Sequence, residues 1–129
     1  MKNLEHIGIA VGDLKEAERI FGDVLGEEPY KREEVASEGV LTSFFNAGGT
    51  KVELLVPISD QSTIARHLEK HGPGLHHLAF LVDDLDAELE RLTALGYRVV
   101  TAPKAGADGK RIAFLHPNDT AKVLVELCE

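Results

Sequence analysis

The stretch HIGIAVGDL at residues 6–14 decides the fold of this chain, because the chain contains it twice. It returns as HLAFLVDDL at residues 77–85, 71 positions later (77 − 6). Each copy opens on a histidine, continues as an apolar run typical of a β-strand, and leads into a helical pattern. Side chains alternate across a strand, so each histidine shares a face with a small residue, Gly8 or Ala79. That alternation leaves room beside each histidine.

The repeat extends through the rest of the chain. KVEL at residues 51–54 is echoed by LVEL at 124–127, which places Glu53 and Glu126 73 positions apart (126 − 53). The sequence therefore contains two copies of one β-α-β-β-β unit, and each copy supplies an early histidine and a late glutamate within apolar strands. Two half-length units of this kind are expected to share a core or a continuous sheet.

Length and composition indicate one soluble domain. The chain has 129 residues, 43% of them hydrophobic and 28% charged. No apolar run reaches the length of a membrane span, and the N-terminus lacks the layout of a signal peptide. The single cysteine, Cys128, excludes an internal disulfide, so we expect a cytoplasmic protein in which Cys128 is an inert strand residue.

The charge balance argues against nucleic-acid binding. Twenty-two acidic and 14 basic residues give a formal charge of −8, whereas nucleic-acid binding needs a clustered basic face. A small anionic substrate would need a local basic patch. Four basic residues are candidates for it, and a solvated loop and strand edge explains them equally well: Lys104, Lys110, Arg111 and Lys122.

Hydrophobic periodicity predicts a first module at about 1–58, a linker helix at about 59–72 and a second module at about 73–129, within a single domain spanning 1–129. Asp13 is predicted to cap the first helix, with Glu16 completing a capping box, and Gly26 to end it. The predicted helices begin at Asp13, Ser62 and Asp84. A hairpin turn is predicted at Gly48-Gly49, and a flexible loop that could close over a ligand is predicted at 105–109. The predicted strands lie at 3–11, 28–36, 40–47, 51–56, 75–82, 97–101, 111–116 and 122–128.

The repeated histidines and glutamates predict a metal site. A glutamate within an apolar strand is expensive to bury unless it is paired or bound to a metal. Two imidazoles and two carboxylates suit Zn, Fe(II), Co, Ni or Mn. A lone strand histidine is more often a hydrogen-bonded core residue, but the joint recurrence favours ligation. The predicted ligands are His6, Glu53, His77 and Glu126; the predicted non-ligands are His67, His71, His76 and His116.

Several segments carry a family resemblance over nearly the whole chain. They are HIGIAV at 6–11, ELLVP at 53–57, STIA at 62–65, GLHHLA at 74–79, IAFLHP at 112–117 and VLVEL at 123–127. With them the chain resembles the vicinal oxygen chelate superfamily, which includes the glyoxalases and bleomycin resistance proteins, and within it the methylmalonyl-CoA epimerases. The GLHH and FLHP segments are the most specific to the epimerase branch.

The resemblance implies an α+β fold in which two βαβββ modules form a U-shaped mixed sheet around a divalent metal, in a cytoplasmic homodimer. It implies that His6, His77 and Glu126 bind the metal, with Glu53 where the family has Gln or Glu. Cobalt is the first expectation for the metal, and zinc, nickel, manganese and iron are the alternatives. The implied partner is an acyl-CoA substrate, with no nucleic acid and no membrane.

The implied reaction is an isomerisation, the epimerisation of methylmalonyl-CoA. A proton leaves the carbon between thioester and carboxylate, the metal stabilises the enolate, and a proton returns on the opposite face. Glu126 resembles one of the two bases. For the other, the family has Glu or Asp two residues before a glycine, whereas here Ser37 takes that place with Glu38 beside it. Glu38 can serve if the backbone there bulges or turns.

Three alternatives use a similar scaffold. The first is a glyoxalase I-like lactoylglutathione lyase, against which the HPN segment at 116–118 replaces the Asp-Pro-Asp-Gly often seen in that branch. The second is a metal-free small-molecule binding module like the bleomycin-sequestering proteins, which lack the ligand set. The third is an extradiol dioxygenase, but most of these need a chain about twice as long. The epimerase interpretation fits the sequence best.

Overall fold

Residues 2–129 of the chain, which the computed structural model describes, form eight β-strands, three α-helices and one short 3₁₀ turn. They divide into two units between His76 and His77. Residues 6–76 make the first unit, and residues 77–129 together with residues 2–5 make the second unit. The boundary lies a few residues after the predicted start of the second module.

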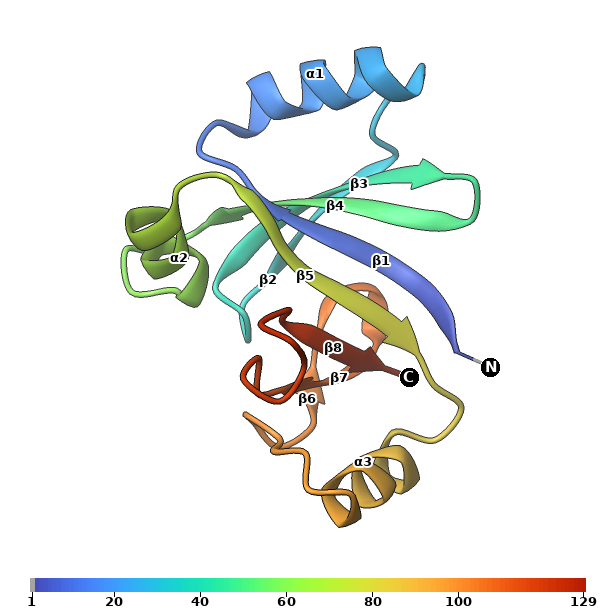
Figure 1. Cartoon of the computed structure of the whole chain (residues 1–129). Helices are drawn as coiled ribbons and strands as arrows, with labels where there is room; N and C mark the ends of the chain where they lie inside the picture. Colours follow the sequence, from blue (N-terminus) through green and yellow to red (C-terminus); the bar gives the residue numbers. More distant parts are fainter. Residues whose placement is uncertain (1) are drawn as a thin grey trace. The chain divides into compact units, whose positions relative to one another are not determined.

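The first unit carries a mixed sheet with the strand order β1-β4-β3-β2. Here β1 pairs in parallel with β4, whereas β4 with β3 and β3 with β2 are antiparallel. In Figure 1, α1 lies across one face of β3 and β4. The elements are β1 (Asn3–Ala10), α1 (Leu14–Leu25), β2 (Lys31–Val35), β3 (Val40–Ala47), β4 (Thr50–Pro57) and α2 (Thr63–His71).

The second unit repeats this topology with the strand order β5-β8-β7-β6. Again the first strand pairs in parallel with the last, and the other pairs are antiparallel. The mixed strand pairing and the helices confirm the α+β class and the two βαβββ modules. The elements are β5 (Gly74–Leu81), α3 (Leu85–Ala94), β6 (Lys104–Ala105), the 3₁₀ turn Ala107–Gly109, β7 (Arg111–Leu115) and β8 (Val125–Cys128).

Local sequence signals set the helix ends as predicted. The Asp13 side chain accepts a hydrogen bond of 3.1 Å from the backbone N–H of Glu16 and so caps α1. Gly26 ends α1 with a left-handed φ of 68°, a conformation that glycine adopts without a steric penalty. Ser62 and Asp84 cap α2 and α3 with the same type of bond. Each helix therefore starts where a short polar side chain satisfies a free backbone N–H.

The predicted hairpin between β3 and β4 is confirmed. Ala47 pairs with Thr50, so the turn consists of Gly48 and Gly49 alone. Their φ angles are 65° and 96°, as a two-residue turn that follows the twist of the strands requires. This turn determines the register of the whole β3–β4 ladder, and a slip by one residue would exchange its two faces.

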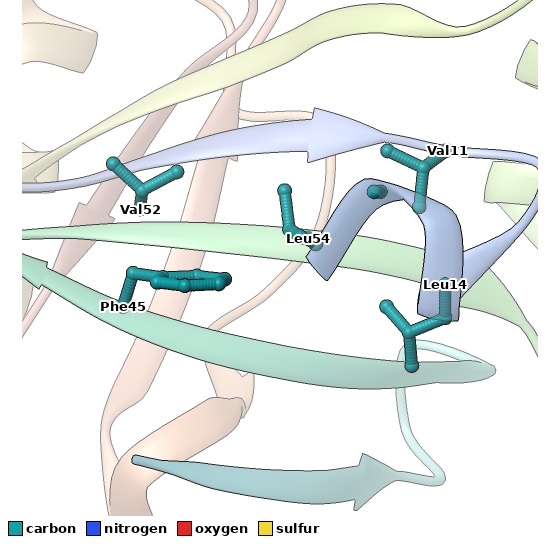
Figure 2. Close-up of a cluster of buried hydrophobic side chains, with 6 residues drawn as sticks. Val11, Leu14, Phe45, Val52 and Leu54 are labelled. Carbon is teal, nitrogen blue, oxygen red and sulfur yellow. The ribbon is translucent and has the colours of Figure 1, made fainter. Parts of the chain in front are cut away.

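One face of the first sheet packs under α1. Figure 2 shows Phe45 of β3 and Val52 and Leu54 of β4 on the same side as Leu14, the first residue of α1, and Val11, which precedes the helix. These side chains are at most 9% exposed. Because side chains alternate along a strand, the opposite face of β4 carries Glu53. The apolar face thus determines which way the candidate site residue points.

The strand predicted at 97–101 in the second module is wrong. Residues 97–101 form no strand; within them only Val99 makes an isolated bridge, to Leu115. The backbone N–H of Arg98 donates instead to the Asp119 carboxylate at 2.9 Å, which removes a donor that a regular ladder would use. The third element of the module is the short strand β6, which reaches only the first residue of the predicted loop at 105–109.

The last strand also differs from its predicted start at residue 122. Ala121 and Lys122 have φ angles of 55° and 69°, a left-handed conformation that no extended strand contains. Residues 117–122 therefore form turns, and β8 begins at Val125. The segment around 105–109 is a tight connection, since Gly106 N–H donates to the Lys110 carbonyl at 2.9 Å.

Two adjacent hydroxyls on β3 should respond in opposite ways to removal. Ser43 is fully buried and donates to Glu18 at 2.6 Å, whereas Thr42 Oγ1 is buried and has no hydrogen-bond partner among residues 2–129. We expect Ser43→Ala to lower the free energy of unfolding by about 1–3 kcal/mol. Thr42→Val should leave it unchanged or raise it by up to about 1 kcal/mol. Urea unfolding measures both, and an equal loss in the two variants would contradict this account.

Candidate metal centre

The first unit holds one buried histidine–glutamate pair. His6 lies on β1 and Glu53 on the parallel neighbour β4, where Gly8 is the residue directly opposite Glu53. His6 Nδ1 lies 3.2 Å from Glu53 Oε2. The two residues are 5% and 3% exposed. The glycine has no side chain to stand between them, so the carboxylate reaches the imidazole two residues along the strand.

The second unit repeats this arrangement. Ala79 of β5 lies directly opposite Glu126 of β8. His77 Nε2 lies 3.2 Å from Glu126 Oε2, and the two residues are 8% and 4% exposed. The predicted pairing of an early histidine with a late glutamate is thus present in each unit. The histidine and glutamate meet because the first and last strands of each module pair in parallel.

Each glutamate has a phenylalanine on its other side, which sequence reasoning missed. Phe44 of β3 pairs with Glu53, and Phe114 of β7 pairs with Glu126. The His77 ring meets the Phe114 ring edge to face, with ring centres 5.8 Å apart. The two phenylalanines are 70 positions apart (114 − 44), which is close to the offsets of the repeat and could have identified them. They make the surroundings of both carboxylates apolar.

The chemistry of the two pairs suits a divalent metal. An ionised carboxylate buried between apolar strands is stable only with a partner that compensates its charge. A neutral imidazole supplies a nitrogen ligand, and the carboxylate supplies an oxygen ligand and a negative charge. The structure brings His6 to Glu53 in one unit and His77 to Glu126 in the other. That all four bind a single ion stays a prediction.

Glu38 lies in the turn between β2 and β3. Its backbone N–H donates to the Val35 carbonyl at 3.0 Å, and Gly39 has a left-handed φ of 67°. Glu38 is half-buried, whereas Ser37 is exposed. Glu38 was predicted to be able to act as a base only if the backbone bulges or turns at this point. The structure shows a turn there.

Two of the four candidate anion-binding residues are engaged in other contacts. The Arg111 guanidinium pairs with Asp86 at 3.0 Å and with Glu129 at 3.2 Å. The exposed Lys122 ammonium donates to the side-chain oxygen of Asn118. These contacts favour the structural interpretation for both residues. Lys104 and Lys110 are half-buried and remain candidates.

The four remaining histidines lie outside the two histidine–glutamate pairs. His116 Nδ1 accepts a hydrogen bond of 3.1 Å from the backbone of Asn118, which places it in a turn as predicted. In the first unit the His67 ring packs against the rings of His71 and His76. Burial and the nearby charge of His71 lower the pKa of His67. His76 has the opposite parity to His77 along β5, which is why it belongs to this second group.

An ion pair holds the segment that leads to β8. Arg98 donates to both oxygens of the Asp119 carboxylate, at 3.0 and 2.9 Å, and its backbone N–H donates as well. The Arg98 side chain first, and then its backbone, hold the pKa of Asp119 at about 2, well below its usual 3.8. These bonds secure the turns at 117–122 that precede the strand carrying Glu126.

Comparisons with known proteins identify the family. Residues 5–114 match the model of the glyoxalase/bleomycin resistance protein/dioxygenase superfamily. The chain is 41% identical to the ethylmalonyl-CoA/methylmalonyl-CoA epimerase of Cereibacter sphaeroides, over 96% of this chain and 95% of that protein. Among residues 2–129, no helix has the length and hydrophobicity needed to cross a bilayer.

Solved structures of similar proteins have the same fold as this chain. Methylmalonyl-CoA epimerase from Mycobacterium tuberculosis superposes with a TM-score of 0.92 at 37% identity, covering 98% of this chain and 86% of that one. A variant of methylmalonyl-CoA epimerase from Streptomyces coelicolor, in complex with 2-nitronate-propionyl-CoA, superposes with a TM-score of 0.92 at 33% identity, covering 99% and 94%. The predicted glyoxalase-like fold is confirmed.

The Arg98–Asp119 contact predicts a defined pH dependence of stability. A carboxyl group whose pKa is lower in the folded state stabilises the fold above its unfolded pKa, and this contribution disappears as pH falls through its folded pKa. We therefore expect Asp119→Asn to be less stable than the parent above about pH 5, with the difference closing as pH falls from 3.8 toward 2. Urea unfolding between pH 2 and 7 measures this. Arg98→Gln should show the same profile, and a gap as large at pH 2 as at pH 7 would exclude the ion pair as its source.

Proposed function

The chain belongs to the glyoxalase/bleomycin resistance protein/dioxygenase superfamily and, within it, to the methylmalonyl-CoA epimerases, and from this premise we propose that it epimerises methylmalonyl-CoA with the help of a divalent metal ion. An isomerase of this kind acts on an acyl-CoA. The observation that carries the proposal is the buried histidine–glutamate pair that recurs in both units. Metal-free binding modules have no need of two such pairs.

His6, His77 and Glu126 would hold the metal, with Glu53 as the fourth ligand. The donor set fits: all four side chains are buried, and each carboxylate already lies within 3.2 Å of an imidazole nitrogen. Two nitrogens and two carboxylates suit cobalt, zinc, nickel, manganese or iron, with cobalt as the first choice. When bound, the metal supplies a Lewis acid for the negative charge that develops on the substrate oxygens.

The chain itself must move a proton. The reacting carbon lies between a thioester and a carboxylate, so its proton is weakly acidic, and inversion needs an acid/base group on each side of that carbon. Glu126 is proposed as one of them, because its carboxylate is buried beside His77 and backed by Phe114. Phe114 gives the carboxylate one apolar side, which would limit the access of water that competes for the proton.

Glu38 is proposed as the second acid/base group. It lies in the tight turn between β2 and β3, at the end of the strand that pairs with the Glu53 strand. A turn frees its side chain from strict strand alternation, so the one-residue shift relative to the family pattern does not by itself disqualify it. Ser37 occupies the family position and carries no carboxylate.

The proposal extends to the setting of the enzyme. The two units are proposed to act as one domain, in a homodimer, in the cytoplasm. Apolar side chains exposed on the first unit support an interface, since Val24 of α1 is 72% exposed, Ile20 43% and Tyr30 51%. Cys128 is the single cysteine of the sequence, and its buried thiol donates to the Phe80 carbonyl, which fits a reducing compartment.

Solvent-deuterium exchange tests the function directly. We expect the metal-loaded protein, incubated with one epimer of methylmalonyl-CoA in D₂O, to incorporate deuterium at the reacting carbon and to lose the chirality of the substrate. NMR and circular dichroism follow the two changes, and the metal-stripped protein is the control. If the loaded protein exchanges no deuterium, the epimerase proposal is wrong, and glutathione hemithioacetals test the lyase alternative.

Glu126→Gln should lower kcat at least about 100-fold, because general acid–base catalysis contributes on this scale. The amide keeps the shape of the side chain but accepts no proton. Glu129→Gln is the matched control, since Glu129 lies at the end of the same segment, is exposed and pairs with Arg111. A Glu126→Gln enzyme that retains most of its turnover with metal bound would remove Glu126 from catalysis.

Glu38→Gln should separate the two directions of the reaction. Each acid/base group serves one face of the carbon, so the variant should lose deuterium exchange from one epimer and keep part of it from the other. Ser37→Ala and Glu34→Gln, both at exposed positions of the same hairpin, are the controls. Equal rates from both epimers would assign the second proton transfer to another group.

A further inference from the structure

Three histidines outside the proposed catalytic site form a cluster in the first unit. His67 and His71 lie one turn apart on α2, and His76 lies on β5 just after the connection at residues 72–74. The ring centres of His67 and His71 are 5.0 Å apart, and those of His67 and His76 are 4.8 Å apart. The proposed reaction uses none of them.

The spacing of His67 from each of the other two rings matches metal ligation. Residues four positions apart on a helix are neighbours on its surface, so His67 and His71 can bind the same ion. A tetrahedral metal with imidazole nitrogens at about 2.0–2.1 Å holds the centres of two rings about 5 Å apart. The His67–His71 and His67–His76 separations are close to this value, so His67 is the central ring of the cluster. Three histidines on one ion also leave a fourth position for water.

The surroundings favour a cation. His71 is the last residue of α2, where the backbone carbonyls give the helix end a partial negative charge. His71 is exposed and His67 and His76 are half-buried, so an ion can reach the cluster from solvent. Burial, and then the nearby charge of His71, lower the pKa of His67, which favours the neutral imidazole that a metal binds.

We propose that His67, His71 and His76 form a second binding site for a divalent transition-metal ion of the zinc or nickel class, distinct from the buried histidine–glutamate pairs. The His67 and His76 rings meet edge to face, at 87°, so binding needs a rotation of the rings toward a common point. The bound ion would link the C-terminal end of α2 to β5 across the Gly72-Pro73-Gly74 connection. It would thereby rigidify the strand that continues directly into His77.

Metal stoichiometry tests the site in untagged protein. The wild type and His67→Phe are saturated with Zn²⁺, freed of excess by gel filtration and measured by mass spectrometry of the metal. The phenylalanine keeps a ring against His76 but has no ligand nitrogen. We expect it to lose one equivalent of zinc per chain, and His71→Ala, at an exposed position, to lose the same equivalent. His116→Gln is the control and should keep the full number.

Two further measurements make the result specific. On addition of Zn²⁺, the imidazole nitrogen signals of all three histidines should shift in ¹⁵N NMR spectra of the wild type. The one-equivalent difference should persist in Glu126→Ala, which disables the proposed catalytic metal site. The site therefore stands or falls independently of the proposed function. If both cluster variants bind as much zinc as the wild type, or the imidazole signals do not move, the second site does not exist.

Discussion

A buried carboxylate in the middle of an apolar strand constrains the strand order, the register and the neighbouring side chains of each unit. Glu53 and Glu126 are at most 4% exposed, and each lies between a small residue on one neighbouring strand and a phenylalanine on the other. Such a group is stable in the fold only beside a partner that compensates its charge. In both units an imidazole nitrogen lies 3.2 Å from the carboxylate, where a bound metal ion would supply the compensating charge. The strand order, the register and the small residues all serve to bring the two groups together.

The parallel pairing of the first and last strand in each module makes this contact possible. His6 and Glu53 are far apart in the chain, and no local signal brings them together. The two-glycine hairpin fixes the register of β3 against β4, and the apolar face under α1 fixes which side chains of β4 point away from the helix. With the register and the apolar face determined, Glu53 must lie on the face of β4 that points away from α1. The second unit reaches the same result with Ala79 in place of Gly8.

The parts of the fold that depend on neighbouring residues were predictable. Asp13, Ser62 and Asp84 cap their helices as expected, because a cap involves residues three positions apart. The predicted strand at 97–101 failed for the opposite reason. Its Arg98 N–H binds Asp119, 21 residues further along, and such a competitor is invisible to a pattern of hydrophobic residues. The left-handed turn at Ala121 and Lys122 likewise shortened the last strand.

The sequence by itself determined the repeat, the class of fold and the identity of the paired residues. The histidine and glutamate of each copy stand out because a polar group in an apolar strand recurs at matched positions, and recurrence needs no coordinates to be seen. Only the tertiary structure decided which atoms meet, that phenylalanines wall in the carboxylates, and that three further histidines gather at the end of α2. These features depend on strand register and on contacts between distant segments, and the free energy of such contacts is set by packing in three dimensions and not by the local order of residues.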